Sequence, residues 1–428
     1  MLSVENLGGE LTGNELNGVV SETLKGFKRV KKVLLIHPDY TRRDFSHRLV
    51  PLIYRELKSK GMQEIHSLNA SGTHRRMREE EICAKLGIRG KINFTKFYNH
   101  EYDNPHQLIT VGEVPASFVA KKTEGELRQS IPITINKLIM GDYDLIIVLS
   151  GTVPHEASGY SGGLKSFFPG ISGPEVIDLF HWTAVLIGVP KIIGSINNPA
   201  RDVINEGSYH VFQKIKAPVV SFNMVFEEKD LEVKPKGLYT GVGFDEFIAV
   251  YEEAARASSK LHIIYVDEPL EVAVQVISKD YDEIWTAGKG SYKLQRQGVI
   301  ANEGEIIIYA PHINCFHSNP KMDIAIKRIG YHSKDYVKEY LRSNPGFNRN
   351  VAAHVINVRG PGVYNSATGE EKFNFKVTLA TGIPEEVCRA VGLAYRDPAS
   401  IRKEDFRGSK KLWIPNGGKY LYDIKTNL

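Results

Sequence analysis

Two histidines and a lysine surround a glycine-rich turn in the middle of the chain. His155 is followed ten residues later by Lys165, and His181 lies sixteen residues beyond the lysine. Gly162 and Gly163 predict a sharp turn between them, since glycine adopts backbone conformations that other residues avoid. Imidazole exchanges protons near neutral pH and is a good ligand for transition metals. The spacing therefore predicts that the chemistry of this chain takes place here.

A short apolar segment comes just before the turn. Residues 143–150 are rich in β-branched and aliphatic side chains and end in a small polar residue, as a buried parallel strand does. His155 thus lies just past the carboxyl end of a strand, where open α/β sheets bind ligands. Polar clusters end other predicted strand segments, and we expect them to line the same crevice; they lie at residues 37–44, 70–75 and 97–103.

The length and the apolar pattern indicate an α/β chain of two domains with doubly wound sheets and an active-site cleft between the domains. The 428 residues exceed what one hydrophobic core usually organises. We predict an N-terminal cofactor-binding domain over residues 1–265 and a C-terminal substrate domain over residues 266–408. Residues 409–428 could pack back onto the first domain. The segments 261–266, 283–288 and 305–310 are predicted strands near and within the second domain.

The composition is that of a soluble enzyme in a reducing compartment. Three cysteines, Cys83, Cys315 and Cys388, are too scattered for a disulfide framework or a CxxC zinc site. The start of the chain lacks a basic segment followed by an apolar run, and no apolar stretch is long enough to cross a bilayer. The net charge of +5 is small, and the basic residues are interspersed with acidic ones. We therefore expect a cytoplasmic protein that binds neither membranes nor nucleic acid.

Several motifs can be considered together. They are His155, Gly162-Gly163-x-Lys165 and Pro169-Gly170, with Asp39-x-Thr41-Arg42 and Asn99-His100-Glu101 upstream. Their combination resembles the nickel-dependent lactate racemase family. The resemblance covers most of the chain and implies an isomerase, a racemase or epimerase of 2-hydroxy acids. It also implies that Lys165 is joined through a thioamide to a nickel-pincer nucleotide of the pyridinium-3,5-dithiocarboxylic acid mononucleotide type, with His181 as the nickel ligand. Cofactor-maturation proteins would then be partners of the chain.

The resemblance further implies which side chains act on the substrate. His100 and His155 match the histidines that exchange the hydroxyl proton, one for each hand of the substrate, while the C2 hydrogen leaves as hydride and returns on the other face. Arg42 matches an arginine that pairs with the carboxylate or stabilises the developing carbonyl oxygen, with Arg43 as a competitor. Besides Lys165, the implied cofactor-binding residues are Asp39, Thr41, Gly162 and Gly163.

The C-terminal part departs from the family pattern. Where the family shows Tyr-Gln-x-x-Lys beside the substrate, this chain has Tyr292, Lys293 and Arg296. These substrate-binding candidates add positive charge and hydrogen-bond donors, which suits a sugar acid or a hydroxy dicarboxylate better than lactate. In the plainer interpretation Lys293 points to solvent. The roles of His74, Arg75 and Phe347, which lie near other family motifs, stay open.

Other interpretations remain for these motifs. The glycines could form only a strand-to-helix turn, Lys165 could be a surface lysine, and the histidines could be core or capping residues. His312-x-x-Cys315-x-His317 could hold zinc in a hydrolase, although a polar loop at a strand end fits it better. A third class is a nonenzymatic protein that binds a sugar acid or a nucleotide.

Overall fold

The computed structural model describes residues 1–229 and 232–427. It confirms the α/β class that the sequence predicts. The chain divides into two compact units. The first unit contains Met1–Phe180 and Ile196–Leu261, and the second contains His181–Ser195 and the chain from His262 onward.

A seven-stranded sheet organises the first unit, in the order β1-β11-β10-β7-β2-β3-β4. The strands from β10 to β4 run parallel to their neighbours, as the predicted doubly wound sheet requires. β11 pairs antiparallel with β10, because only two residues separate these strands and a parallel pair needs a long crossover. β1 in turn pairs antiparallel with β11. The bounds are β1 Leu2–Glu5, β2 Lys32–Pro38, β3 Glu64–Ala70, β4 Lys96–Asn99, β7 Leu145–Gly151, β10 Val219–Lys229 and β11 Glu232–Val242.

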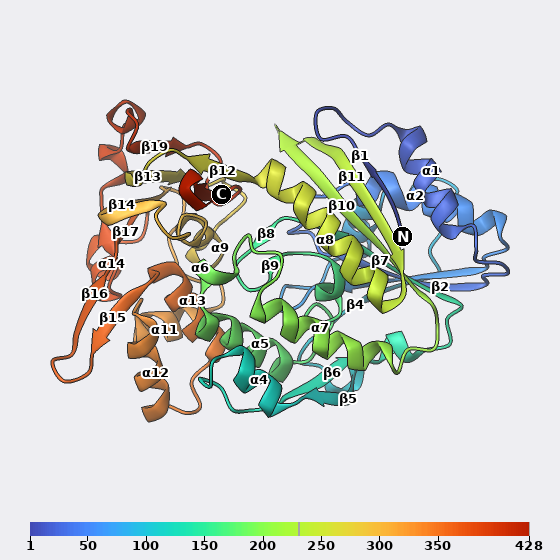
Figure 1. The fold of residues 1–428 in the computed structure, drawn as a ribbon, viewed down its shortest axis with the longest axis horizontal. Helices are drawn as coiled ribbons and strands as arrows, with labels where there is room; N and C mark the ends of the chain where they lie inside the picture. The colour runs from blue at the N-terminus through green and yellow to red at the C-terminus, as the bar shows by residue number, and fades with distance from the viewer. Residues whose placement is uncertain (230–231, 428) are drawn as a thin grey trace. The chain divides into compact units, whose positions relative to one another are not determined.

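Helices cover both faces of this sheet (Figure 1). On one face, α1 (Gly13–Leu24), α2 (Ser46–Ser59) and α3 (Glu79–Leu86) pack their apolar sides on strand residues such as Leu35 and Leu149. On the other face, α8 (Gly243–His262) packs Val250 against Val225. β7 is therefore buried on both sides, which explains its unbroken apolar run.

Smaller elements complete the first unit. They are β5 Leu108–Val114 paired with β6 Ile131–Asn136, β8 Pro154–His155 paired with β9 Gly159–Tyr160, the helices α4 Ala116–Lys122 and α7 Pro199–Phe212, and the 3₁₀ turns η1 Pro105–Gln107, η2 Lys137–Met140 and η3 Gly163–Ser166. The helix α5 (Pro174–Ile187) begins in this unit, and the unit boundary falls within it at Phe180.

A five-stranded parallel sheet organises the second unit, in the order β18-β17-β14-β13-β19. Its strands are β13 Leu270–Val276, β14 Ile300–Ala310, β17 Lys376–Thr381, β18 Ala394–Tyr395 and β19 Lys411–Ile414. Two small pairs accompany it, β12 Ile263–Val266 with β20 Leu421–Ile424 and β15 Gly362–Asn365 with β16 Glu370–Phe373. Its helices and turns are α6 Val189–Ile192, α9 Ile284–Ala287, α10 Lys289–Tyr292, α11 Pro320–Ile329, α12 Lys334–Ser343, α13 Arg349–Arg359, α14 Glu385–Ala390, η4 Pro398–Ser400, η5 Lys403–Phe406 and η6 Lys425–Asn427.

Three segments differ from their predicted placement. The segment 283–288, predicted as a strand, contains the helix α9, since a short apolar run does not distinguish the two structures. Residues 181–195 belong to the second unit because Val189 and Ile193 pack on Leu421. The C-terminal segment also lies in the second unit and not on the first, because β19 pairs with β13.

Within residues 1–229 and 232–427, no helix is both long and apolar enough to cross a membrane.

Candidate functional site

Asp39 is the centre of a hydrogen-bonded group just past the end of β2. One carboxylate oxygen accepts from the Thr41 backbone N–H at 2.9 Å and from its hydroxyl at 2.6 Å, and the other bonds Nδ1 of His74. Burial raises the pKa of Asp39, but His74, Arg42 and Thr41 outweigh it and lower the pKa to about 2. Asp39 is therefore an ionised acceptor at neutral pH, and the structure brings it together with Thr41 and Arg42 as predicted.

The backbone of Arg42 is held from α3. The Lys85 amine donates to the Arg42 carbonyl oxygen and lies 2.8 Å from the buried Asp44 carboxylate. The Arg42 guanidinium makes no hydrogen bond or ion pair in the described part of the chain and remains available for a ligand, whereas Arg43 pairs with Glu228 at 3.3 Å. The structure thus favours Arg42 over its neighbour as the anion-binding arginine.

Lys165 lies on η3, directly after the glycine turn. The residue is half-buried, but the surroundings of its amine lower the pKa to about 7. Burial is the main cause; Arg42 and Arg201 lower the pKa as well, while Glu156 and Asp39 oppose them. A large fraction of this amine is neutral at pH 7, which does not fit a solvated surface lysine.

Gly162 and Gly163 are required by the turn itself. Both have positive φ, +86° and +60°, which disfavours residues with a side chain. A Cβ at Gly162 would lie 2.9 Å from the Thr152 hydroxyl, and one at Gly163 would lie 3.1 Å from Cβ of Tyr251. On the side where a Cβ would lie, the glycines face protein atoms, so the turn itself requires glycine at both positions.

His155 ends β8 and is buried within the β8–β9 hairpin. Its Nδ1 accepts from the Ala157 N–H at 3.2 Å and lies 3.5 Å from a carboxylate oxygen of Glu156. The ring is thus anchored on one side by its own hairpin.

His100, predicted as the second acid–base residue, has both ring nitrogens in internal hydrogen bonds. Nε2 donates to the Ser172 carbonyl oxygen at 2.9 Å, and Nδ1 accepts from the Asn136 amide at 3.2 Å. Burial lowers the pKa of His100 to about 4, although the Ser172 bond opposes this. The ring is a neutral, satisfied core histidine in this structure, and a proton-transfer role would require it to break one of these bonds.

His74, whose role the sequence left open, lies beside Asp39 and is partly exposed. It bonds the Asp39 carboxylate, and its side chain keeps 37% of its exposure. It follows β3 as Asp39 follows β2, and these strands are neighbours in the sheet. The signal in the sequence was that polar residues follow two consecutive predicted strands, which places His74 and Asp39 at the same edge of the sheet.

His181 lies on the part of α5 that belongs to the second unit. Its Nδ1–H donates to the side-chain oxygen of Asn350 at 3.1 Å. This bond selects the tautomer whose lone pair is on Nε2, which is the arrangement of a histidine that ligates a metal.

The substrate-side candidates of the second unit are differently engaged. Arg296 pairs with the buried carboxylate of Asp423 at 2.8 Å, so its guanidinium is a structural partner and not the predicted free fork of donors. Lys293 is 6% exposed, which contradicts the solvent-facing interpretation. Tyr292 packs on the apolar cluster around Val189.

The sequence run His312-x-x-Cys315-x-His317 does not assemble as a metal site. His312 bonds the Tyr281 carbonyl oxygen, and His317 pairs with Glu283 and packs on Trp285. Among the described residues, no group of three His, Cys, Asp or Glu side chains could hold a metal ion. The zinc hydrolase interpretation therefore has no ligand set in this part of the chain.

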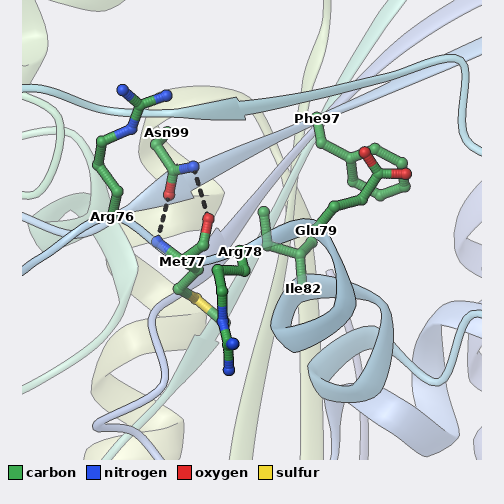
Figure 2. Close-up of a pocket in the computed structure, with 7 residues that line it drawn as sticks. All are labelled: Arg76, Met77, Arg78, Glu79, Ile82, Phe97 and Asn99. Atoms are coloured by element: carbon green, nitrogen blue, oxygen red, sulfur yellow. Dashed lines mark hydrogen bonds between the residues drawn. The ribbon is translucent and has the colours of Figure 1, made fainter.

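Two pockets open on the first unit. One, of about 440 Å³, is lined by Arg76, Met77, Arg78, Glu79, Ile82, Phe97 and Asn99. Figure 2 shows that Asn99 is locked there by two hydrogen bonds with the Met77 backbone. The other, of about 270 Å³, contains Arg42 and Lys85. Only the second pocket includes a predicted substrate-binding residue.

Part of the first unit and the start of the second are similar to known proteins. Residues 16–190 match the model of the lactate racemase N-terminal domain. A segment of 177 residues is 29% identical to the lactate racemases of Thermoanaerobacterium thermosaccharolyticum and Lactiplantibacillus plantarum. This part of the chain is thus similar to the N-terminal domain of lactate racemases. The aligned segment covers 41% of this chain and 38% of each lactate racemase.

Solved structures extend the likeness in fold to nearly the whole chain. The lactate racemase apoprotein of T. thermosaccharolyticum has a TM-score of 0.68 at 18% identity and covers 95% of this chain, with 93% of its own length matched. A crystal structure of a protein from Thermotoga maritima has a TM-score of 0.91 at 55% identity, over 99% of this chain and 100% of that one. The fold of lactate racemase thus includes the second unit as well as the N-terminal domain.

Lys165 should react as a partly neutral amine at pH 7 in protein made without cofactor. Because its pKa is about 7, acetylation of this amine by a small anhydride should reach half of its maximal rate near pH 7. Arg42→Gln removes a charge that lowers the pKa, so the half-point should move to higher pH. Peptide mass spectrometry across a pH series measures the rates.

Arg43→Gln is the matched control, since it removes a neighbouring guanidinium that pairs with Glu228. It should leave the half-point in place. A Lys165 that becomes reactive only near about pH 10, as an unperturbed lysine does, would contradict the neutral amine.

Proposed function

We propose that this chain is an isomerase that inverts C2 of a 2-hydroxy acid by means of a nickel-pincer nucleotide attached to Lys165. The observation that carries the proposal is the position of Lys165 on η3, directly after the glycine turn, where burial and the nearby charge of Arg42 lower the pKa of its amine to about 7. A neutral amine is the form that can attack an activated carboxyl group to make an amide-type bond. The lactate racemase N-terminal domain supports the same assignment.

Two residues fit the cofactor that the resemblance implies. Lys165 supplies the amine for the thioamide, and His181 has the tautomer that a nickel ligand needs. Imidazole nitrogen and sulfur donors suit nickel in a square-planar environment. When bound, the group supplies an acceptor that takes the C2 hydrogen as hydride and returns it. Cofactor-maturation proteins are the partners that this attachment requires.

The protein's own residues bind the substrate and move its hydroxyl proton. The unpaired guanidinium of Arg42 binds the carboxylate. His74 and His155 are the proposed pair that takes the hydroxyl proton from either hand of the substrate and returns it. Asp39 holds Nδ1 of His74, so Nε2 is the nitrogen that exchanges the proton. His100 is proposed to support the end of β4 instead.

The substrate is proposed to be larger or more polar than lactate, as a sugar acid or a hydroxy dicarboxylate is. The support is Lys293, which replaces a neutral glutamine of the family and is buried. Arg296 no longer adds to this support, because Asp423 occupies its guanidinium.

The covalent attachment gives the decisive test. Protein purified from cells that make the pincer nucleotide should carry an added mass, and peptide mapping should place it on Lys165, with nickel present. Lys165→Arg is the control, since it has a long basic side chain but lacks a primary amine. An unmodified Lys165 in cells that modify a known lactate racemase would rule the proposal out.

Hydride transfer makes a separate prediction about isotopes. A substrate identified by screening hydroxy dicarboxylates and C2-epimeric sugar acids should be prepared with deuterium at C2. Because the hydrogen returns from the cofactor, most of the deuterium should remain after conversion in ordinary water, as measured by NMR or mass spectrometry. Loss of deuterium at the rate of turnover would instead indicate proton abstraction from carbon.

The assignment of His74 in place of His100 can be tested with paired variants. His74→Asn should lower kcat by about 10²-fold to 10⁴-fold, as expected for loss of an acid–base group, with little change in stability. His100→Asn removes buried hydrogen bonds and should lower the free energy of unfolding by about 1–3 kcal/mol. Steady-state kinetics and urea unfolding measure the two effects. The assignment returns to His100 if its variant is inactive but equally stable while His74→Asn stays active.

A further inference from the structure

Arg201 is a buried cation in an unfavourable place. Asn198 caps α7 and Pro199 follows it, so Arg201 lies in the first turn of that helix, at the positive end of the helix dipole. The residue is 3% exposed and forms no ion pair in the described part of the chain. Buried charges are normally paired with an opposite charge. A guanidinium kept under these conditions indicates a role other than general stability.

Arg201 contacts the hairpin that contains His155. One guanidinium nitrogen donates to the Tyr160 carbonyl oxygen at 2.5 Å, and Tyr160 belongs to β9, the partner strand of β8. The same oxygen accepts from the Ser158 hydroxyl at 2.9 Å. Arg201 therefore fixes the strand that faces His155.

The Arg201 guanidinium is also connected, through Tyr251, to the turn before Lys165. It lies over the ring of Tyr251 on α8, 3.8 Å from the ring centre. Tyr251 packs directly on Gly163, where a Cβ would come within 3.1 Å of the tyrosine Cβ. The Tyr251 hydroxyl donates to the Ser158 carbonyl oxygen at 3.4 Å. One tyrosine thus contacts both the hairpin and the glycine turn.

We infer that Arg201 and Tyr251 form a brace that fixes the β8–β9 hairpin, with His155, relative to the turn that carries Lys165. Both are positioning residues, and their importance for the reaction rests on the proposed function of His155 and Lys165. The brace also has an electrostatic effect, because the charge of Arg201 favours the neutral amine of Lys165.

The test uses full-length protein without cofactor. Arg201→Met should slow acetylation of Lys165 at pH 7 by about twofold or more, because its half-point moves to higher pH. The variant should also speed hydrogen exchange of peptides spanning residues 153–161 by about threefold or more, since the hairpin loses its support. Arg256→Met, which removes an exposed arginine of α8 that pairs with Glu252, is the matched control and should change neither readout.

Arg201→Lys separates the two effects. It keeps the positive charge but not the broad stacking surface, so acetylation of Lys165 should follow the wild type while the hairpin exchanges faster. If Arg201→Met does not fold, this variant decides the matter: unchanged exchange of residues 153–161 overturns the brace. Unchanged acetylation and exchange in a folded Arg201→Met protein do the same.

Neither readout depends on nickel or on the pincer nucleotide. A chain that shows both changes but never acquires an adduct at Lys165 would keep the brace and lose the proposed function. A chain that acquires the adduct but shows neither change would keep the function and lose the brace.

Discussion

The parallel register of β2, β7 and β10 is the constraint on which the site depends. Ile36 is level with Val148, and Ser150 is level with Asn223, so the three strands end at one edge of the sheet. There the Gly163 N–H donates to both the Ser150 hydroxyl and the Asn223 side-chain oxygen, each at 3.1 Å. Two strand ends therefore hold the turn that presents Lys165. The chemistry-bearing loops start from this rigid edge, as in other open α/β sheets.

The surroundings at this edge favour the ionised form of one titratable group and the neutral form of another. Hydrogen bonds and nearby cations hold Asp39 ionised, while burial and two arginines hold much of Lys165 neutral. Environments that move the pKa values of neighbouring groups in this way separate their charge states, and here they give an ionised acceptor and a largely neutral amine. The two arginines are positioned by different contacts. The Lys85 amine bonds the backbone of Arg42, whereas the side chain of Arg201 contacts Tyr160 and Tyr251.

Local sequence patterns predicted the α/β class and the grouping of Asp39, Thr41 and Arg42 near Lys165. The apolar run of β7 and the polar residues after β2 suffice for that, because both are short-range features. The pattern could not show that His100 satisfies both nitrogens or that Arg296 is paired with Asp423, since those partners are distant in the sequence. Nor could it show why Gly162 is glycine, which depends on the hydroxyl of Thr152 across the turn. These features depend on tertiary partners, which residue types and their spacing do not reveal.

The division of the second unit into two stretches of chain has a consequence for its synthesis. Val189 and Ile193 are synthesised before Ile196–Leu261, the second stretch of the first unit. Leu421, on which they pack, is synthesised much later. The first unit has all of its residues once Leu261 has been synthesised, so it can fold while this apolar segment still waits for its partner. Until the C-terminal strands are synthesised, Val189 and Ile193 lack the apolar side chain on which they pack in the folded unit.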